Sequence, residues 1–139
     1  MLLLPSARAS DASWDIEAAP GSLEIRISKA AQKMSIYVDG ELQYVFVVST
    51  GRGGHGTPSG TFPVLWLNPM AYAPKYDNAP MPHSIFFTRA GHAIHGTGHL
   101  QTLGRPVSHG CVRLAPEAAE LLFALVRQIG RRNTTVRIM

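Results

Sequence analysis

Hydrophobic and polar positions alternate through the first third of the chain. In residues 23–28, LEIRIS, every second residue is leucine or isoleucine, and residues 33–39, KMSIYVD, repeat this pattern. A period of two is typical of β-strands with one buried face. Asp39-Gly40 is a strong signal for a two-residue hairpin turn, and it leads into residues 41–50, ELQYVFVVST. Because this last segment is apolar on both faces, we expect it to be a central strand of a sheet.

The middle of the chain contains two more apolar runs around a proline-rich stretch. Residues 61–67, TFPVLWL, and 83–88, HSIFFT, are expected to form strands. Residues 68–82 carry four prolines, so we expect a long loop there, of the kind that commonly serves as a binding loop or lid. Two tyrosines and two methionines of this loop could line a substrate groove or cover the core instead: Met70, Tyr72, Tyr76 and Met81.

The period changes to that of a helix near the C-terminus. Residues 116–130, PEAAELLFALVRQIG, place apolar side chains at helical spacing, namely Ala118, Leu121, Leu122, Leu125 and Ile129. Pro116 suits the first turn of a helix and Gly130 its end. Residues 134–139, TTVRIM, predict a closing strand. The pattern as a whole therefore predicts a mainly β domain with one amphipathic helix.

Composition adds limits on size and on partners. The chain has 139 residues, of which 45% are hydrophobic and 16% charged, enough for one domain with its own core. The net charge of +4 favours binding to an anionic polymer, or it serves only solubility. Because no nucleic-acid reader motif is present, we expect no nucleic-acid partner and consider an anionic cell-wall polymer instead.

The first nine residues, MLLLPSARA, contain three leucines followed by Ala7-Arg8-Ala9, a small-x-small pattern that precedes signal cleavage sites. The stretch lacks a positively charged start and is too short for a complete signal peptide. We expect residues 1–21 to be a signal-peptide remnant and linker, with a frayed tail as the alternative, and the protein to be exported to the periplasm or cell wall. Residues 22–139 are expected to form the folded domain.

Candidate chemistry is concentrated in residues 91–114, GHAIHGTGHLQTLGRPVSHGCVRL. This stretch holds the single cysteine, Cys111, and four of the six histidines: His92, His95, His99 and His109. A thiol beside imidazoles can be an activated nucleophile, a metal site or a buried small hydrophobe. For zinc, three of the histidines would have to share a helix face with the thiol nearby. Glycines at 91, 96 and 98 disfavour that helix, so we expect no metal.

A nucleophilic cysteine needs a base for its proton and a third group that orients the base. His95 lies sixteen residues before Cys111, so the chain can fold back and present its ring across the thiol, whereas His109 would compete for the same small space. The Gly96 carbonyl could accept the second ring N–H. The backbone N–H groups of Gly110 and Cys111 could stabilise an oxyanion. The predicted helix follows closely, and its dipole could lower the thiol pKa.

Three ordered blocks carry a family resemblance. IHGT at 94–97 and SHGCVRL at 108–114, together with GRGGHGTPSGTFPV at 51–64 preceded by Ser49 and Thr50, resemble the signature of the L,D-transpeptidase catalytic domain, the YkuD-like family. The resemblance covers residues 22–139. It implies an L,D-transpeptidase-type β-sandwich with the amphipathic helix after the catalytic loop.

The resemblance also implies a reaction. A peptidoglycan L,D-transpeptidase forms 3→3 crosslinks by acyl transfer through a thioester, here on Cys111, and releases D-Ala from tetrapeptide stems. The implied partners are the tetrapeptide donor, a diaminopimelate amine or a lipoprotein or outer-membrane protein as acceptor, and carbapenem-type inhibitors. We expect no cofactor and a monomer. The alternatives are an L,D-carboxypeptidase or hydrolase, an enzyme that attaches proteins to peptidoglycan or releases them, and a non-catalytic wall-binding module.

The predicted catalytic residues are Cys111, His95, His109, Gly96 and Gly110. Four further residues are candidates for substrate binding. Arg113 could hold a substrate carboxylate as a bidentate fork or form a structural ion pair. Ser108 could contact the substrate or order the turn, and Tyr72 belongs to the groove residues above. His83 stands where family members often have a tyrosine whose hydroxyl assists the oxyanion site, and it could substitute for it.

Overall fold

The computed structural model describes residues 21–139, so the predicted signal remnant in residues 1–20 lies outside it. Two sheets make up the fold. The five-stranded sheet has the order β3-β2-β1-β9-β4, formed by Glu41–Val47, Lys33–Val38, Leu23–Ser28, Thr134–Ile138 and Gly60–Pro63. The four-stranded sheet has the order β5-β6-β7-β8, formed by Trp66–Ala73, Ala79–Phe86, Ala93–Gly96 and Val112–Leu114. The helix α1 covers Pro116–Ile129, and short 3₁₀ turns cover Pro74–Tyr76 (η2), Leu100–Thr102 (η3) and Arg131–Asn133 (η4).

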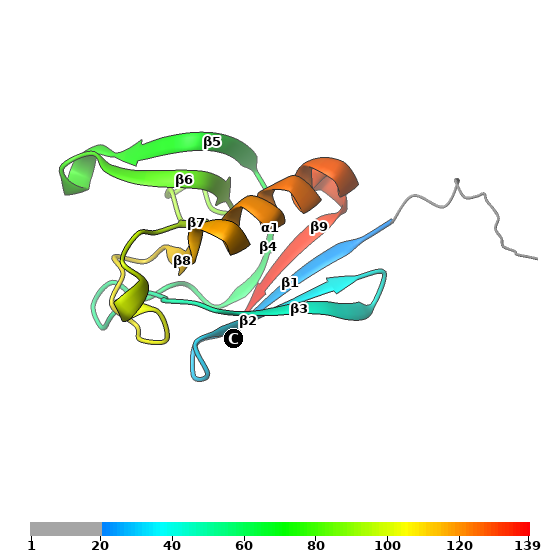
Figure 1. The fold of residues 1–139 in the computed structure, drawn as a ribbon, viewed down its shortest axis with the longest axis horizontal. Coiled ribbons are helices and arrows are strands. Elements are labelled where there is room, and N and C mark those ends of the chain that lie inside the picture. The colour runs from blue at the N-terminus through cyan, green and yellow to red at the C-terminus, as the bar shows by residue number, and fades with distance from the viewer. Residues whose placement is uncertain (1–20) are drawn as a thin grey trace, which may run out of the picture.

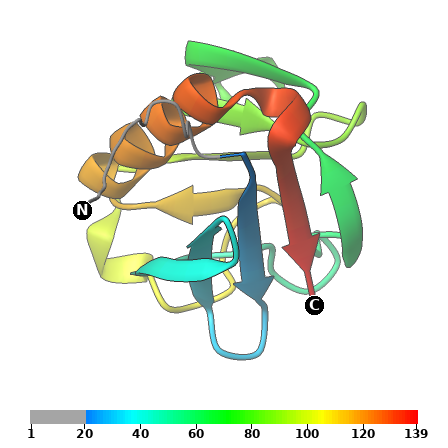
Figure 2. The same ribbon diagram turned by 90° about the vertical axis from the view of Figure 1, so that its right-hand side faces the viewer.

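The two sheets and the helix share one hydrophobic core. Figure 1 shows β5 and β6 on one side of the molecule and β1, β2 and β3 on the other, with α1 between them. The core draws on all three layers, including Ile25, Ile36 and Val136, then Ile94 and Leu114, then Leu122 and Val126. β9 lies parallel to β1, although they come from opposite ends of the described chain (Figure 2). The prediction of a mainly β fold with one amphipathic helix is confirmed.

The strand that we expected at the centre of a sheet lies at its edge. β3 pairs only with β2 in the five-stranded sheet, and its residues are almost all exposed. Its apolar side chains Leu42, Val45 and Val47 are about half accessible to solvent. Two apolar faces are therefore compatible with an edge strand, and the prediction of a central position is wrong.

The predicted long loop at 68–82 is a β-hairpin. β5 and β6 pair directly from Trp66 opposite Phe86 to Ala73 opposite Ala79, with only η2 and a short turn at the tip. Proline usually interrupts a sheet because it lacks an N–H. Pro80 and Pro82 are tolerated because the part of β6 that contains them pairs with β5 alone. The pairing between β6 and β7 is limited to Ile85 and Phe86 of β6.

The helix begins and ends as predicted, but its buried face is shifted. Its buried residues are Ala119, Leu122, Phe123, Val126 and Ile129, so Leu122 and Ile129 are shared with the prediction. Leu121 and Leu125 are only partly buried. The helix packs against β6 and β7, and the direction of that contact decides which part of a wide apolar stripe faces inward.

Candidate active site

The parallel pairing of β7 with β8 brings the predicted base and nucleophile to one face. Ile94 is opposite Val112 and His95 is opposite Arg113. Val112 and Leu114 are fully buried in the core, so by alternation Cys111, one residue before β8, projects from the other face. On β7, Ile94 is in the core and His95 alternates with it in the same way. The imidazole and the thiol therefore lie on the same face of neighbouring strands.

The His95 ring is held in one orientation. Its Nδ1 lies 2.7 Å from the Gly96 carbonyl oxygen, and because a carbonyl can only accept, Nδ1 carries the proton and donates. Nε2 is then the free, basic nitrogen of the neutral ring. The side chain is 6% exposed. Burial lowers the pKa of His95 to about 4, the Gly96 carbonyl offsets part of this, and the positive charge of Arg113 lowers the pKa further. The ring is therefore neutral at pH 7.

Cys111 is half-buried and packs against a small cluster of Ala71, Met81 and Ala93. Burial raises the pKa of its thiol, although the Ala93 N–H and Arg113 act in the opposite direction. Its sulfur is 3.9 Å from the Gly91 carbonyl oxygen. The expectation that the thiol pKa is lowered is therefore wrong for this resting state. The pair is a neutral thiol and a neutral imidazole, so deprotonation must accompany attack.

The helix dipole cannot supply the missing stabilisation of a thiolate. α1 begins at Pro116, beyond the C-terminal end of β8, whereas Cys111 precedes its N-terminal end. The three residues of β8 between them span about 10 Å, and the influence of a helix end is confined to about one turn. The closeness of thiol and helix in sequence is therefore misleading.

Residues 108–111, SHGC, form a sharp turn that a buried serine holds in place, and we call it the nucleophile turn. Ser108 Oγ donates to the Cys111 carbonyl oxygen at 2.6 Å and accepts the Gly110 N–H at 3.1 Å. Ser108 is fully buried, so it orders the turn and is not placed to touch a substrate. The Gly110 N–H is already engaged, which leaves the Cys111 N–H as the oxyanion donor of the predicted pair.

Gly110 is needed for its backbone conformation. Its φ of +123° is strained for any residue with a side chain, and an added Cβ would lie 3.2 Å from Cδ2 of His92. The His92 ring is oriented by Thr88, whose Oγ1 lies 2.7 Å from Nδ1. From the sequence, His92 was expected to be a loop residue or a zinc ligand. Nothing but its place in the histidine-rich stretch indicated that it would pack beneath the nucleophile turn.

The glycine-rich segment 51–60 wraps around the nucleophile turn. Thr57 Oγ1 donates to the Gly110 carbonyl oxygen at 2.8 Å and accepts the Gly51 N–H at 2.9 Å. Two backbone hydrogen bonds join Ser108 to Thr50 and Arg52. A side chain at Gly51 would collide with the carbonyl oxygen of His55. These contacts explain why the two sequence blocks occur together.

The His109 side chain is exposed and packs against the tip of the β5–β6 hairpin. Its exposed ring stacks on Tyr76 at the tip of the β5–β6 hairpin, with centroids 4.0 Å apart and planes 7° apart. His55 approaches it edge-on at 5.6 Å. Burial lowers the pKa of His109, with smaller effects in the same direction from Arg52 and Arg113. His109 therefore joins the hairpin tip to the nucleophile turn.

Two predicted substrate-binding residues lie elsewhere. Ala71 and Ala73 belong to the apolar cluster against which Cys111 packs. Tyr72 lies between them in β5, so its side chain points to the opposite face of the strand. His83 has a φ of +53°, and its ring packs against Phe123 of α1 at 5.3 Å. His83 also lines a groove of about 340 Å³ beside the helix, and it is not placed to act as an oxyanion donor. Arg113, opposite His95, remains beside the site.

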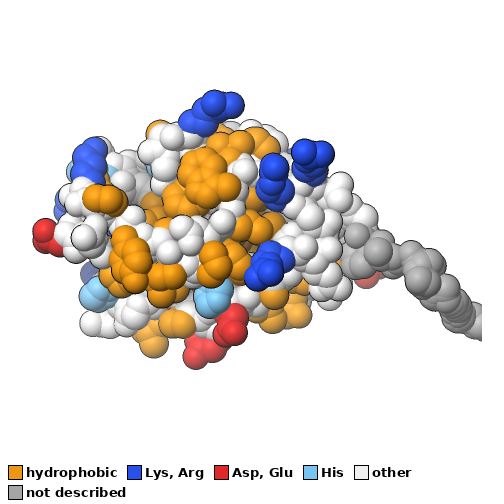
Figure 3. Space-filling view, turned by 90° about the horizontal axis from the view of Figure 1, so that it is seen from above, with side chains coloured by type: hydrophobic (Ala, Val, Ile, Leu, Met, Phe, Trp, Pro, Cys, Tyr) orange, Lys and Arg blue, Asp and Glu red, His pale blue; other side chains and the backbone are white. Residues whose placement is uncertain are grey.

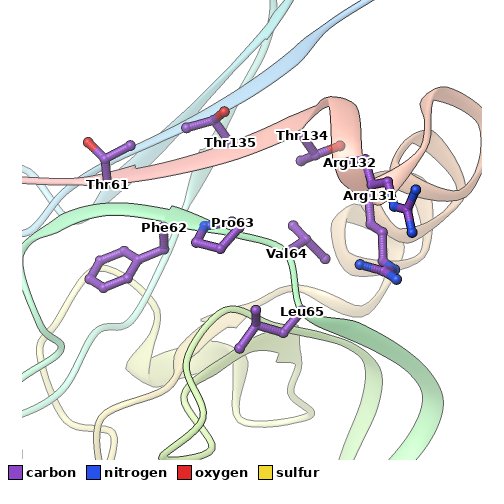
Figure 4. A pocket seen from close by; sticks show the side chains of 9 residues that line it. All are labelled: Thr61, Phe62, Pro63, Val64, Leu65, Arg131, Arg132, Thr134 and Thr135. Atoms are coloured by element: carbon purple, nitrogen blue, oxygen red, sulfur yellow. The ribbon is translucent and has the colours of Figure 1, made fainter.

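A larger groove of about 440 Å³ lies between β4, β9 and η4. Figure 4 shows Arg131 and Arg132 on one side of it and Phe62, Pro63 and Leu65 on the other. The lining contains neither cysteine nor histidine, so this groove is separate from the candidate chemistry. Across residues 21–139, no three His, Cys, Asp or Glu side chains are grouped to hold a metal ion, and no helix is long and apolar enough to span a bilayer.

Two packed sheets, a single helix after the cysteine turn, and a cysteine and histidine on adjacent parallel strands together define an L,D-transpeptidase-type domain. The chain belongs to the family of L,D-transpeptidase catalytic domains, YkuD, whose model matches residues 22–138. It is 27% identical over 119 residues to the putative L,D-transpeptidase YqjB of Bacillus subtilis, a match that covers 77% of this chain and 68% of that protein.

Solved structures share the fold. An L,D-transpeptidase from Mycobacterium smegmatis superposes with a TM-score of 0.76 at 22% identity, covering 85% of this chain and 58% of that one. L,D-transpeptidase 3 from Mycobacterium tuberculosis, in complex with a faropenem-derived adduct, gives 0.73 at 20% identity, covering 86% and 60%. The chain thus spans about three fifths of the length of these structures.

Proposed function

We propose that this protein is a cysteine-dependent peptidoglycan L,D-transpeptidase that forms 3→3 crosslinks. The observation that supports this most directly is the hydrogen bond from His95 Nδ1 to the Gly96 carbonyl oxygen. It presents a neutral, basic Nε2 on the face from which Cys111 projects. Family membership supports the reaction class. Because the substrate lies outside the cytoplasmic membrane, the proposal places the enzyme in the periplasm or cell wall.

In the first half-reaction, the Cys111 sulfur attacks the carbonyl between the L-centre of diaminopimelate and the terminal D-Ala. His95 Nε2 takes the thiol proton as the C–S bond forms. The C–N bond then breaks, and the D-Ala amine leaves with that proton. A histidine whose pKa is lowered to about 4 is a weak base but, once protonated, a strong acid, so it returns the proton readily to the leaving amine.

In the second half-reaction, the side-chain amine of another stem attacks the thioester carbonyl. His95 accepts a proton from that amine, the new amide forms, and the sulfur leaves and recovers its proton. The Cys111 N–H is the backbone donor proposed for the oxyanion of both tetrahedral intermediates. Arg113, on the same face as His95, is proposed to pair with a substrate carboxylate.

The test uses purified tetrapeptide stems and identifies the products by mass. Transpeptidase activity predicts a crosslinked dimer and free D-Ala, both absent with Cys111→Ala. Tripeptide without dimer would indicate the L,D-carboxypeptidase alternative. A lipoprotein-derived lysine peptide added as acceptor tests for protein attachment.

Covalent labelling by imipenem gives an independent test of the nucleophile. We expect one adduct on intact protein and none on Cys111→Ala. A Ser59→Ala variant, altered in the exposed part of the glycine-rich segment, is the control and should acylate normally. Wall binding without acylation or turnover would favour the non-catalytic binding module and refute the proposed function.

A further inference from the structure

Trp66 is an exposed aromatic side chain with a rigid support. It is 42% accessible to solvent, and its ring stacks on Phe86 with centroids 4.6 Å apart and planes 16° apart. Phe86 in turn packs against the Ala71, Met81 and Ala93 cluster. A single exposed hydrophobic residue needs no explanation, but a contiguous apolar surface can mark an interaction site, and here two stacked rings lie side by side. The pair therefore forms a flat apolar platform on the surface.

This platform lies in one row with the candidate nucleophile. Trp66 is opposite Phe86, and Phe86 is opposite Ala93. Ile94 of β7 is opposite Val112 of β8 in a parallel ladder. The preceding residues on the two strands, Ala93 and Cys111, therefore lie side by side. Both Phe86 and Cys111 pack against the cluster that contains Ala93, so the whole row projects from the same face of the sheet. Alternation is not continuous from Trp66 to Tyr72, because the β5–β6 ladder skips Pro69 and His83 and His83 has a φ of +53°.

Strand spacing gives the length of the row. Neighbouring strands are about 4.8 Å apart, so three steps place the platform about 14 Å from Cys111. Figure 3 shows hydrophobic side chains gathered over the β5 and β6 side of the molecule, with lysine, arginine and acidic side chains toward the edges of the view.

A ring of this kind suits a sugar. The two faces of a pyranose carry C–H groups that pack on an aromatic surface, whereas its hydroxyl groups at the edge stay in water. Asn68, on the same face of β5, has its Oδ1 engaged by the Met70 N–H at 3.0 Å, so its NH₂ group can donate to a hydroxyl or acetamide oxygen. In residues 21–139, the outer edge of β5 has no neighbouring strand and could pair with an extended peptide instead, so the test below compares substrates with and without sugar.

We propose that Trp66, supported by Phe86, is a subsite for a pyranose of the glycan strand that carries the donor stem. This inference rests on the proposed function. Three residues separate the scissile carbonyl from the sugar, and in extended form they span about 10 to 11 Å. The lactyl ether and the γ-linkage of the stem lengthen that path. The sugar therefore reaches the platform when the carbonyl is at Cys111.

The experiment compares a disaccharide-tetrapeptide with the same tetrapeptide lacking sugar. We expect Trp66→Ala to lower kcat/KM on the disaccharide substrate by about five- to tenfold, a stacking-sized effect, and to leave kcat/KM on the bare peptide unchanged. Trp66→Phe should recover most of the loss. The control is Tyr44→Ala, which removes the exposed member of another stacked pair, Tyr44 and Phe46, on the five-stranded sheet. It should change neither value.

Equal losses on both substrates would mean that Trp66 supports the peptide or the fold, and no loss on either would mean that the platform is unused; each result overturns the inference. Imipenem acylation at the wild-type rate shows that Trp66→Ala leaves the nucleophile intact. A binding measurement separates this inference from the proposed function. In the Cys111→Ala background, an N-acetylglucosamine tetramer should bind several-fold more weakly after Trp66→Ala. If it does, the subsite stands even when turnover fails; unchanged binding overturns it.

Discussion

The buried His95 side chain should make the free energy of unfolding depend on pH. Burial lowers the pKa of His95 from 6.5 to about 4, whereas in the unfolded chain the ring is solvated and takes up a proton near its ordinary pKa. Between these two values the unfolded state binds more protons than the folded state, so stability falls as the pH falls. Each pKa unit corresponds to about 1.36 kcal/mol, so the loss on going from above pH 6.5 to below pH 4 is about 3 kcal/mol.

The perturbation is His95→Gln, which removes the titration and keeps an N–H group that can donate to the Gly96 carbonyl. Urea unfolding at intervals from pH 7.5 to 3.5 gives the free energy of unfolding for the wild type and the variant. We expect the wild type to lose about 3 kcal/mol more than His95→Gln over this range. Subtraction removes the contributions of other groups, including the carboxyl of Glu24, whose pKa is lowered mainly by a hydrogen bond from Arg26.

A matched control is Cys111→Ser, which alters the same site but retains His95 and should keep the pH dependence of the wild type. A histidine titration followed by NMR measures the pKa directly. If His95→Gln and the wild type show the same pH dependence, or if the ring titrates near 6.5 in the folded protein, then the ring is solvated and the argument for a buried neutral base fails.

Three further predictions concern the nucleophile turn. Gly110→Ala should destabilise the protein by about 2 kcal/mol, because it places a side chain at a φ of +123°; an unchanged urea midpoint would contradict this. Ser108→Ala should lower the free energy of unfolding by about 1 to 2 kcal/mol, since it leaves the buried Gly110 N–H without its partner. It should also slow acylation. A free energy of unfolding within about 0.3 kcal/mol of the wild-type value, the scatter of neutral changes, would show that the hydroxyl is dispensable. Because burial raises the pKa of Cys111, iodoacetamide should label it more slowly at pH 7 than a small model thiol, with a rate that climbs above pH 9; faster labelling than the model thiol would show a thiolate at rest.

Much of the architecture could be predicted from local patterns. The alternation at 23–28 and 33–39, the Asp39-Gly40 turn and the helix between Pro116 and Gly130 all depend on neighbours within a few residues. The same holds for the turn at Cys111, where a glycine allows the backbone conformation and a serine satisfies nearby polar groups. Short-range chemistry is encoded residue by residue, so it can be read without coordinates.

The wrong predictions concern features that depend on contacts between segments far apart in the chain. Whether β3 is central or at an edge depends on which strands lie beside it. The hairpin at 66–86 tolerates its prolines because that part of β6 has β5 as its one neighbouring strand in the described chain. The pKa of the Cys111 thiol is raised because side chains of β5, β6 and β7 bury it, and the adjacent helix does not offset this.

The residues that carry the chemistry can be recognised from the chain alone, because a single cysteine in a histidine- and glycine-rich turn leaves few nucleophiles to choose from. Their surroundings depend on the packed fold. It set the protonation of the resting pair, placed Tyr72 and His83 away from the thiol, and aligned Trp66 with Cys111 across four strands. The physical reason is that solvent exclusion and strand register arise from contacts between segments far apart in the chain, which no local pattern records.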